Sequence, residues 1–561
     1  MTKARKRRIK WFRRRKGGKV YRYPYLGYYC RNEKGTPTFV REVSLTGLPE
    51  EQVEAMDRGL RGAPVADPSL VPVNGVRYEG SVEVGATWTA LRLIEQLGVR
   101  ALLNAGLAAC SAVAVTAMIL DRVVSALPHS KRALCAGFPS SALARILRAA
   151  AIPLHKWYRA LDELYRQQTR IEAALATDIT DRIFLYDITS VYFEGKHCPL
   201  ADWGYNRDGK KGKKQIVVGL LTNARGRPLA VRVFRGNTKD ETTVVGQMDR
   251  LREQFGADEF IFVGDRGMLT GNIRAALDED AKRRIDYITA LPRAEIMSFI
   301  EADDHPFQPG LFDWRNLVEV VHEHKRYILC HNPEKRLEDE RTRERLLNLT
   351  EEKLESVARN VRAGRYKREK VIAKRLYRWL DRWGMGKFFS VDYAEAHFEY
   401  ARDEQKIQQY SNLDGCYVIV TTLTGGAMGN EEVVARYKSL AQIEKAWRMM
   451  KTADEFVRPV RHWSPTRVCG HVFMCMLAYL TIWRARECFA PFLERDADRT
   501  CEGDSLREMW EGLDRHVTIG TLNLNGETTD QLSPIPVFQR RLLAAAGATI
   551  GPSERERLGV V

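Results

Sequence analysis

A series of strand-like and helix-like segments between residues 183 and 292 constrains the fold of this chain more than any other feature. Its three leading apolar strands are joined by tight, glycine-bearing connections, which predict an antiparallel meander. The last two strands flank a helix, which predicts a parallel pair with a right-handed crossover. The segments are the strands 183–193, 216–223 and 229–234, the helix 242–256, the strand 260–265, the helix 272–280 and the strand 287–292. We therefore expect an α/β fold with element order βββαβαβ, a mixed sheet with helices on its faces.

Three acidic residues lie in settings that suit metal-dependent chemistry. Asp187 lies within the first strand, Asp265 at the carboxyl end of the fourth, and Glu444 in the helix-like stretch 437–451. Open α/β sheets place ligands at the ends of strands that begin crossovers. Carboxylates and a substrate phosphate can hold two Mg²⁺ ions, which can cut and rejoin phosphodiesters. The alternative is that the two aspartates are ordinary cap or turn residues.

The stretch around Glu444 has helical spacing. Tyr437, Leu440, Glu444, Arg448 and Lys451 lie at offsets 0, 3, 7, 11 and 14, which stay on one face of a helix. That face presents a carboxylate flanked by two cations and a phenol, as a phosphate-binding site requires. The alternative is an exposed face stabilised by the Glu444–Arg448 pair.

A glycine-rich loop between the first two strands carries five cations. This loop, residues 203–215, fits a DNA-backbone clamp beside Asp187, with a solvated turn as the alternative. The segment 235–243 joins the third strand to its helix and supplies Asn237 and Asp240 as supporting residues. The residues to which we assign DNA binding are Tyr437, Arg448, Lys451, Arg207, Lys210, Lys211, Lys213, Lys214 and Arg266.

The positive charge of the chain is concentrated near its amino-terminal end. The net charge is +17 over 561 residues, and residues 1–19 hold eleven Lys or Arg and no acid. Such a block predicts a polyanion-binding arm in which Trp11 and Phe12 insert or stack, and a disordered tail is the alternative. No apolar segment follows it as a secretory signal would require, and the cysteines form no CxxC pair. We expect reduced thiols and a cytoplasmic protein.

Two further segments have alternative interpretations. Residues 101–120 carry no charge and are long enough to span a bilayer, but their many alanines and three interrupting polar residues favour a buried helix. His322, His324, Cys330 and His331 fit no standard zinc spacing, which favours an exposed polar strand.

Shifts in composition divide the chain into seven segments. The helical one near residues 87–176 suits either a DNA-reading unit or an ordinary bundle, and the charged tract after residue 331 predicts exposed helices in an antiparallel pair. The segments are a basic arm (1–19), a small β unit and linker (20–85), a helical, possible DNA-end-binding domain (86–178), the first part of the core (179–295), a largely helical insertion (296–412), the second part of the core with the Glu444 helix (413–485) and a C-terminal region (486–561).

Six motifs follow one another between about residues 180 and 455. They are YDITSVYFEG around Asp187, GYNRDGKKGKKQIVVGLL, FRGNTKDETT, VGDRGM around Asp265, DGCYVIVTT and the Glu444 helix. In this order the chain resembles the DDE transposases of bacterial insertion sequences, in particular the IS-four group with its YREK signature. The signature is Tyr, two residues, Arg, three residues, Glu, six residues and Lys. Tyr437, Glu444 and Lys451 match it, whereas Leu440 stands where Arg is expected, and we expect Arg448 to replace that cation.

The resemblance implies an RNase H-like core that an insertion domain interrupts before the glutamate helix. It implies that Asp187, Asp265 and Glu444 are the catalytic and metal-ligating residues, with two Mg²⁺ ions that Mn²⁺ can replace. It also implies double-stranded DNA partners, namely transposon ends and target DNA, and a homodimer in the active complex. The implied location is prokaryotic and nucleoid-associated, without a membrane.

The chain is therefore predicted to be a transposase that binds terminal inverted repeats and catalyses cut-and-paste transposition by phosphodiester hydrolysis and transesterification. One alternative is an RNase H-like nuclease without strand transfer, which an assay for joined product distinguishes. The other is a transposon-derived DNA-binding protein that no longer cuts, which would bind the repeats without any Mg²⁺- or Mn²⁺-dependent product.

Overall fold

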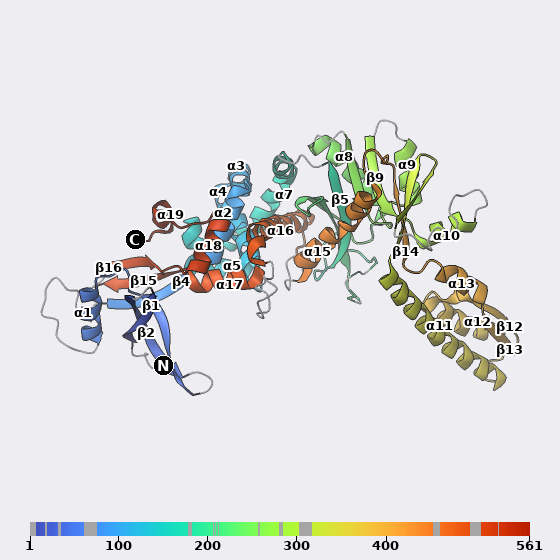
Figure 1. Ribbon diagram of the computed structural model, residues 1–561, viewed down its shortest axis with the longest axis horizontal. Coiled ribbons are helices and arrows are strands. Elements are labelled where there is room, and N and C mark those ends of the chain that lie inside the picture. The colour runs from blue at the N-terminus through green and yellow to red at the C-terminus, as the bar shows by residue number, and fades with distance from the viewer. Residues whose placement is uncertain are drawn as a thin grey trace.

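The computed structural model describes an elongated molecule (Figure 1). A block of helices lies between a large mixed sheet on one side and two small sheets on the other, and the first and last elements of the chain lie at the same end. The described residues are 7–16, 19–31, 35–60, 76–177, 182–205, 207, 209–210, 212–255, 259–279, 284–301, 317–452, 461–493, 506–524 and 527–560.

The large sheet has eight strands in the order β10-β11-β14-β9-β8-β5-β6-β7. The strands β5, β6 and β7 form an antiparallel meander, β8 is parallel to β5, and β9 is parallel to β8. Every residue of β6 is buried, which explains why this strand is a continuous apolar run in the sequence. The predicted order βββαβαβ is confirmed by β5 Ile183–Tyr192, β6 Gln215–Asn223, β7 Pro228–Arg235, α8 Glu241–Phe255, β8 Glu259–Gly264, α9 Gly271–Glu279 and β9 Arg284–Ala290.

Two strands from the segment assigned to the insertion extend this sheet. β14 (Cys416–Thr421) pairs with β9 and with β11 (Lys325–His331), and β10 (Leu317–His322) pairs with β11 at the edge. The expectation of an exposed polar strand is wrong for β11, because five of its seven residues are buried and Cys330 is only 3% exposed. Within the described ranges no three Cys, His, Asp or Glu side chains are grouped closely enough to hold a metal ion as they stand, and this includes His322, His324, Cys330 and His331.

The central block of helices packs around α16 (Pro465–Leu493), which contacts α7, α4 and β7. The uncharged run 101–120 is buried in part but is not one helix, since Leu107 is extended (φ −118°, ψ 156°) between α3 and α4. By length and composition α16 is the one described helix that could cross a membrane, yet 83% of its apolar window is buried inside the protein. The other helices are α2 Gly85–Gln96, α3 Val99–Gly106, α4 Ala109–Val124, α5 Lys131–Gly137, the 3₁₀ helix η2 Phe138–Ser140, α6 Ala142–Leu147 and α7 Leu154–Ala176.

Most of the basic arm is a β-strand. β1 (Arg7–Lys16) pairs along its whole length with β2 (Lys19–Arg31), and β2 pairs with β3 (Pro37–Ser44). The alternative of a disordered tail is therefore wrong for β1.

The two aromatic side chains of the basic arm have partners inside this small sheet. The guanidinium of Arg22 lies 4.3 Å from the centre of the Trp11 ring, and that of Arg41 lies 3.9 Å from the centre of the Phe12 ring. Both rings are thus engaged with cations of the neighbouring strands.

The predicted linker and the C-terminal region meet in a second small sheet. β4 (Val76–Glu83) pairs with β15 (Thr518–Leu524), which pairs with β16 (Glu527–Leu532). Asn523 donates a 2.8 Å hydrogen bond to Glu79, 444 positions away in the sequence. The linker thus contains regular structure, and the remaining elements of these regions are α1 Glu50–Leu60, α17 Leu506–His516, α18 Val537–Ala545 and α19 Pro552–Leu558.

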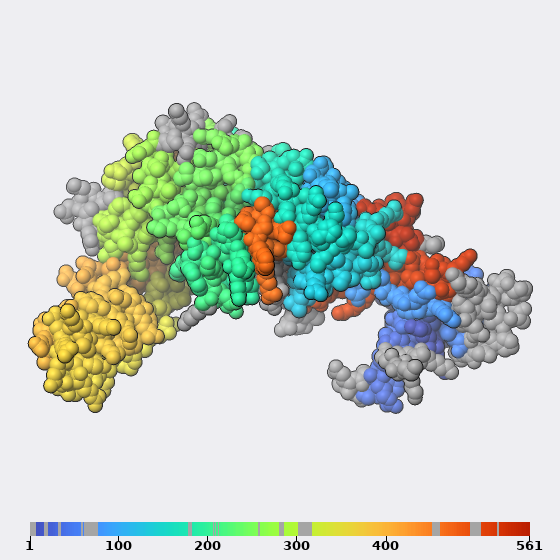
Figure 2. Space-filling model, turned by 180° about the vertical axis from the view of Figure 1, so that it is seen from behind, coloured from blue at the N-terminus to red at the C-terminus, as the bar shows by residue number. Residues whose placement is uncertain are grey.

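The charged tract forms a helical projection beyond the large sheet (Figures 1 and 2). The predicted helix pair is confirmed: α11 and α12 pack around an apolar cluster that includes Leu347, Leu354 and Leu376. The Asn332 side chain caps the start of α11 by accepting bonds from the backbone of Glu334 and Lys335. The elements are α10 Arg293–Glu301, α11 Pro333–Arg362, α12 Glu369–Arg382, the 3₁₀ helix η4 Gly386–Phe388, β12 Phe389–Ala394, β13 His397–Arg402 and α13 Glu404–Ser411.

Candidate active site

Asp187 and Asp265 lie on adjacent parallel strands of the large sheet. Asp187 is in β5, and Asp265 is the first residue after β8. The last paired residues of these two strands are Tyr186 and Gly264, and each aspartate directly follows one of them. The two carboxylates are therefore presented from equivalent positions of neighbouring strands.

Glu444 reaches the same place from a helix. A cavity of about 540 Å³ is lined by Asp187, Asp265 and Glu444 together with Arg266 and Tyr437. Glu444 lies on α15 (Leu440–Thr452), which buries Ile443, Ala446, Trp447 and Met450 and leaves the glutamate exposed. The fold thus brings the three predicted acids to one cavity.

The single helix predicted for residues 437–451 is wrong. Tyr437 lies near the end of α14 (Asn430–Lys438), and α15 begins after a break at Ser439. The Ser439 hydroxyl donates a 2.5 Å hydrogen bond to the Arg436 carbonyl, a local bond that competes with the helical backbone pattern. Tyr437 nevertheless lines the same cavity as Glu444.

Burial and the neighbouring carboxylates disfavour the charged form of Asp187. Burial raises the pKa of Asp187 to about 7, and the nearby Asp265 and Glu444 add to this effect. Burial also raises the pKa of Tyr437 to about 12, with further contributions from Asp265 and Glu444 that Arg266 opposes. Tyr437 is therefore protonated and can donate a hydrogen bond at neutral pH.

The chemistry of these side chains suits a hard divalent cation. Carboxylate oxygens are the ligands that Mg²⁺ prefers, and a cation would relieve the repulsion between the acids. As they stand, no three acidic, His or Cys side chains of the described residues lie close enough together to hold one ion. The three acids thus suit a metal by ligand type and share one cavity, but their side chains would have to move closer together to hold an ion.

Lys451 connects α15 to the strand that carries Asp187. Its ammonium group donates a 2.7 Å hydrogen bond to the Ser190 carbonyl and another to the Thr189 hydroxyl. Both acceptors lie on β5, a few residues beyond Asp187. Lys451 thus holds the helix of Glu444 against the strand of Asp187.

A second cavity, of about 420 Å³, brings Arg207, Asn237 and Asp240 together. Arg207 forms an ion pair with Asp240, and its backbone N–H donates a 2.9 Å hydrogen bond to the Ser190 hydroxyl. This arrangement fits the supporting role predicted for Asp240, which orients the arginine.

The two cavities are close neighbours. A Cβ atom placed on Gly267 would lie 3.8 Å from a carboxylate oxygen of Asp265 and 4.0 Å from one of Asp240. Gly267 itself lines the second cavity. Gly267 therefore lies close to both carboxylates.

The other cations of the clamp loop differ in their surroundings. Lys213 pairs with Glu194 at 3.7 Å, and the ammonium group of Lys210 lies 5.8 Å from the centre of the Tyr192 ring. Lys214 is partly buried, and its carbonyl accepts a 2.7 Å hydrogen bond from Phe193. Lys211 lies outside the described residues.

Arg266 and Arg448 differ in their relation to the carboxylates. Arg266 lines the cavity with the three acids and acts on the pKa of Tyr437. Arg448 is exposed on α15. Unlike Arg266, it does not line this cavity.

Two exposed aromatic residues of the clamp loop were missed by the sequence reasoning. The side chains of Trp203 and Tyr205 are 59% and 80% exposed, and Tyr205 lines the second cavity. Exposed aromatic rings beside cations are typical of surfaces on which bases stack. The sequence signal was their position at the start of the lysine-rich loop.

Comparison with solved structures gave distant likenesses, among them two to transposases. One is to the piggyBac transposase synaptic complex with hairpin DNA, solved by cryo-EM, at 7% identity over 76% of this chain and 75% of that chain with a TM-score of 0.35. The other is to the Mos1 transposase paired-end complex with left transposon end, at 12% identity over 27% of this chain and 56% of that chain with a TM-score of 0.13. No family model and no curated protein matches the chain. Likenesses this distant leave the function to be argued from the site itself.

Proposed function

We propose that this protein is a divalent-metal-dependent DNA transposase of the DDE class, as its sequence motifs suggest. Asp187, Asp265 and Glu444 would hold two Mg²⁺ ions, and Mn²⁺ can replace them. The observation that carries the proposal is the meeting of these acids, from β5, the end of β8 and α15, at one cavity. The proposed substrate is duplex DNA bearing terminal inverted repeats, and the proposed active form is a homodimer.

The sheet supports an RNase H-like assignment for the core. In the order β7-β6-β5-β8-β9, an antiparallel meander is followed by strands parallel to β5. Asp187 lies in β5 and Asp265 directly follows β8, and these two strands are next to each other in the sheet. Such placement at a crossover edge is where α/β sheets bind ligands.

The bound ions would supply Lewis acidity for an attacking hydroxyl and for the leaving oxygen. The protein's own side chains would bind the DNA strand and hold the carboxylates in position. Arg266 is placed to bind a phosphate oxygen beside the carboxylates, and Tyr437 can donate a hydrogen bond to the strand. Lys451 keeps α15 against β5, so that Glu444 and Asp187 face the same cavity.

Metal removal separates the candidate functions. The protein is incubated with labelled duplex that carries the DNA flanking its coding region, in Mg²⁺, in Mn²⁺ and in EDTA. We expect excised donor and joined product with either metal and neither product in EDTA. Hydrolysis without joining would instead indicate a nuclease, and binding without any metal-dependent product would indicate a non-cutting DNA-binding protein.

Leu440 stands where the YREK signature has an arginine, and comparing two substitutions shows which other arginine takes over that role. Because Arg266 lines the cavity and Arg448 does not, we expect Arg266→Ala to lower the rate of strand transfer by roughly 10–100-fold and Arg448→Ala by less than about threefold. Lys451→Ala serves as the reference for a lost signature residue. A loss in Arg448→Ala as severe as in Lys451→Ala would assign the role to Arg448, as the sequence alone suggested.

A further inference from the structure

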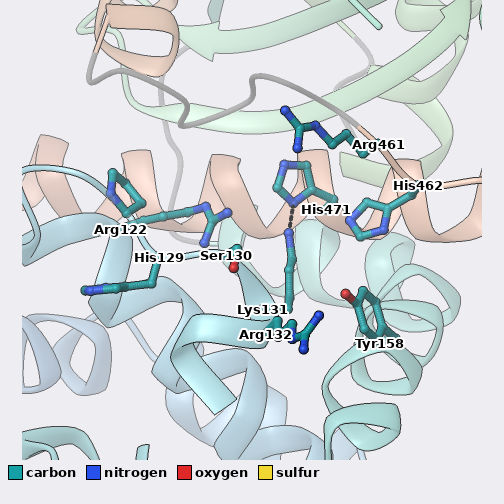
Figure 3. Close-up of a pocket in the computed structure, with 10 residues that line it drawn as sticks. Arg122, His129, Ser130, Lys131, Arg132, Tyr158, Arg461, His462 and His471 are labelled. Carbon is teal, nitrogen blue, oxygen red and sulfur yellow. Dashed lines mark hydrogen bonds between the residues drawn. The ribbon is translucent and has the colours of Figure 1, made fainter. Parts of the chain in front are cut away.

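A third cavity, lined by basic residues, lies among the central helices and outside the candidate active site (Figure 3). It has a volume of about 410 Å³, and its lining includes Arg122, Lys131, Arg132, Arg461, His462 and His471. None of the described residues that line it is an Asp or a Glu. Figure 3 shows Lys131 and His471 pointing toward each other, with His462 and Arg461 beside them.

Arg122 brings an incompletely satisfied cation to this cavity. The residue is only 5% exposed, and its Nε has no hydrogen-bond partner. Its Nη1 donates a long, 3.4 Å bond to the Met118 carbonyl. A buried guanidinium with an unpaired donor is costly unless an acceptor from outside completes it.

Lys131 adds a second basic group close to Arg122. Its Nζ lies 2.8 Å from Nδ1 of His471, so the histidine accepts this hydrogen bond. Burial, and then the charge of Arg122, lower the pKa of Lys131 to about 7. Burial also lowers the pKa of His462 to about 3, with Lys131 acting in the same direction. The cavity therefore crowds basic groups together.

Asp121, which precedes Arg122 in the sequence, is occupied by other hydrogen bonds. Asp121 accepts hydrogen bonds from the backbone N–H of His129 at 2.8 Å, from the His129 ring at 2.7 Å and from the Ser125 hydroxyl at 3.0 Å. Of the four effects on the pKa of Lys131, the charge of Asp121 is the smallest, and it raises that pKa. Among the described residues, Arg122 and Lys131 thus form no ion pair with a carboxylate, whereas Arg461 at the rim lies 3.6 Å from Glu194.

We propose that this cavity binds a phosphate group, either of a DNA strand or of a free phosphate ion. A phosphate oxygen could accept from the unpaired donor of Arg122 and from Lys131, with Arg132 and Arg461 at the rim. The volume of about 410 Å³ accommodates a phosphate with part of its ester. Neither the three acids nor any described residue of the clamp loop contributes to this lining.

The position of the cavity favours a DNA strand as one source. Arg461 lies 3.6 Å from Glu194, and the same carboxylate pairs with Lys213 of the clamp loop. The ring of Trp463 also packs edge-on against His197, with 5.2 Å between ring centres. The rim of the cavity therefore adjoins the loop that is proposed to hold the DNA backbone.

Titration with inorganic phosphate tests the site directly. Calorimetry at constant ionic strength should show saturable binding to the wild-type protein and at least about tenfold weaker binding to Lys131→Met and to Arg461→Gln. Arg362→Gln, which removes an equally exposed arginine from α11, should bind phosphate as the wild type does. Because Arg461 is 71% exposed, its substitution keeps the test valid if Lys131→Met fails to fold.

A second measurement identifies the source of the phosphate. If a DNA strand occupies the cavity, Lys131→Met and Arg461→Gln should lower duplex affinity and reduce the slope of log affinity against log salt by about one. Unchanged DNA binding together with phosphate binding would assign the cavity to the free ion. Absence of saturable phosphate binding, with DNA affinities equal to those of Arg362→Gln, would overturn the proposal. Neither measurement requires DNA cleavage. A protein that bound phosphate in this cavity but gave no metal-dependent DNA product would therefore contradict the proposed function and not this proposal.

Discussion

Asp187→Asn, Asp265→Asn and Glu444→Gln should each lower DNA cleavage and joining by at least about 10³-fold, because each removes a carboxylate that is proposed to hold a metal ion. Each substitution keeps the size of the side chain and removes a charge from a crowded acidic cavity, so the fold should remain intact. Affinity for the DNA ends should change by less than about threefold. Gel assays of product in Mg²⁺ and in Mn²⁺, beside mobility-shift titrations, measure both quantities.

Glu432→Gln provides the matched control for these variants. Glu432 lies on α14, is 50% exposed and pairs with Arg436 at 2.9 Å, outside the lining of the cavity. We expect this variant to cleave and join DNA like the wild type. Strand transfer at a near-normal rate by any one of the three carboxylate variants would remove that residue from the active site.

Glu172→Ala should destabilise the protein by about 3–5 kcal/mol, because it breaks a buried ion-pair network. The Glu172 side chain is 0% exposed and accepts hydrogen bonds from Arg232 at 2.8 Å and from Arg250 at 2.9 Å. It also accepts from Gln168 at 2.7 Å and from the backbone of Val231 at 3.2 Å. Without the carboxylate, two largely buried guanidinium groups lose their counter-charge where α7 meets β7 and α8. Denaturant unfolding of the variant and the wild type measures the loss.

An exposed ion pair provides the comparison for the loss of stability expected in Glu172→Ala. Glu511→Ala removes a carboxylate that is 50% exposed and pairs with Arg507 one turn away on α17, and it should cost less than about 1 kcal/mol. If Glu172→Ala lost no more stability than Glu511→Ala, the buried network would contribute no more to the free energy of unfolding than an exposed ion pair does.

The sequence predicted the centre of the large sheet because its elements are encoded locally. Between residues 183 and 292 each strand is a short apolar run bounded by turn residues, and the intervening helices have their own periodicity. The same runs fix where Asp187 and Asp265 stand relative to their strands. The meeting of both with Glu444 came from the motif resemblance, and the shared cavity agrees with it.

The parts that could not be predicted depend on distant partners or on single side-chain bonds. β10 and β11 join the sheet through pairing with β14, which no local pattern encodes. The break between α14 and α15 coincides with a hydrogen bond from the Ser439 hydroxyl to the Arg436 carbonyl, although the apolar spacing continues across it. The basic cavity requires Lys131 and His471, 340 positions apart, to meet between α5 and α16.

The pairing of β4 with β15 has a consequence for how the protein is made. Glu79 leaves the ribosome long before Asn523, its hydrogen-bond partner 444 positions later. At roughly 5–20 residues per second the interval is on the order of 20–90 s. Until then β4 has no neighbour at that edge, although the Arg7 guanidinium of the basic sheet lies 5.3 Å from the centre of its Tyr78 ring. The basic end of the molecule is thus completed late in translation, after the carboxylate-bearing strands have already been synthesised.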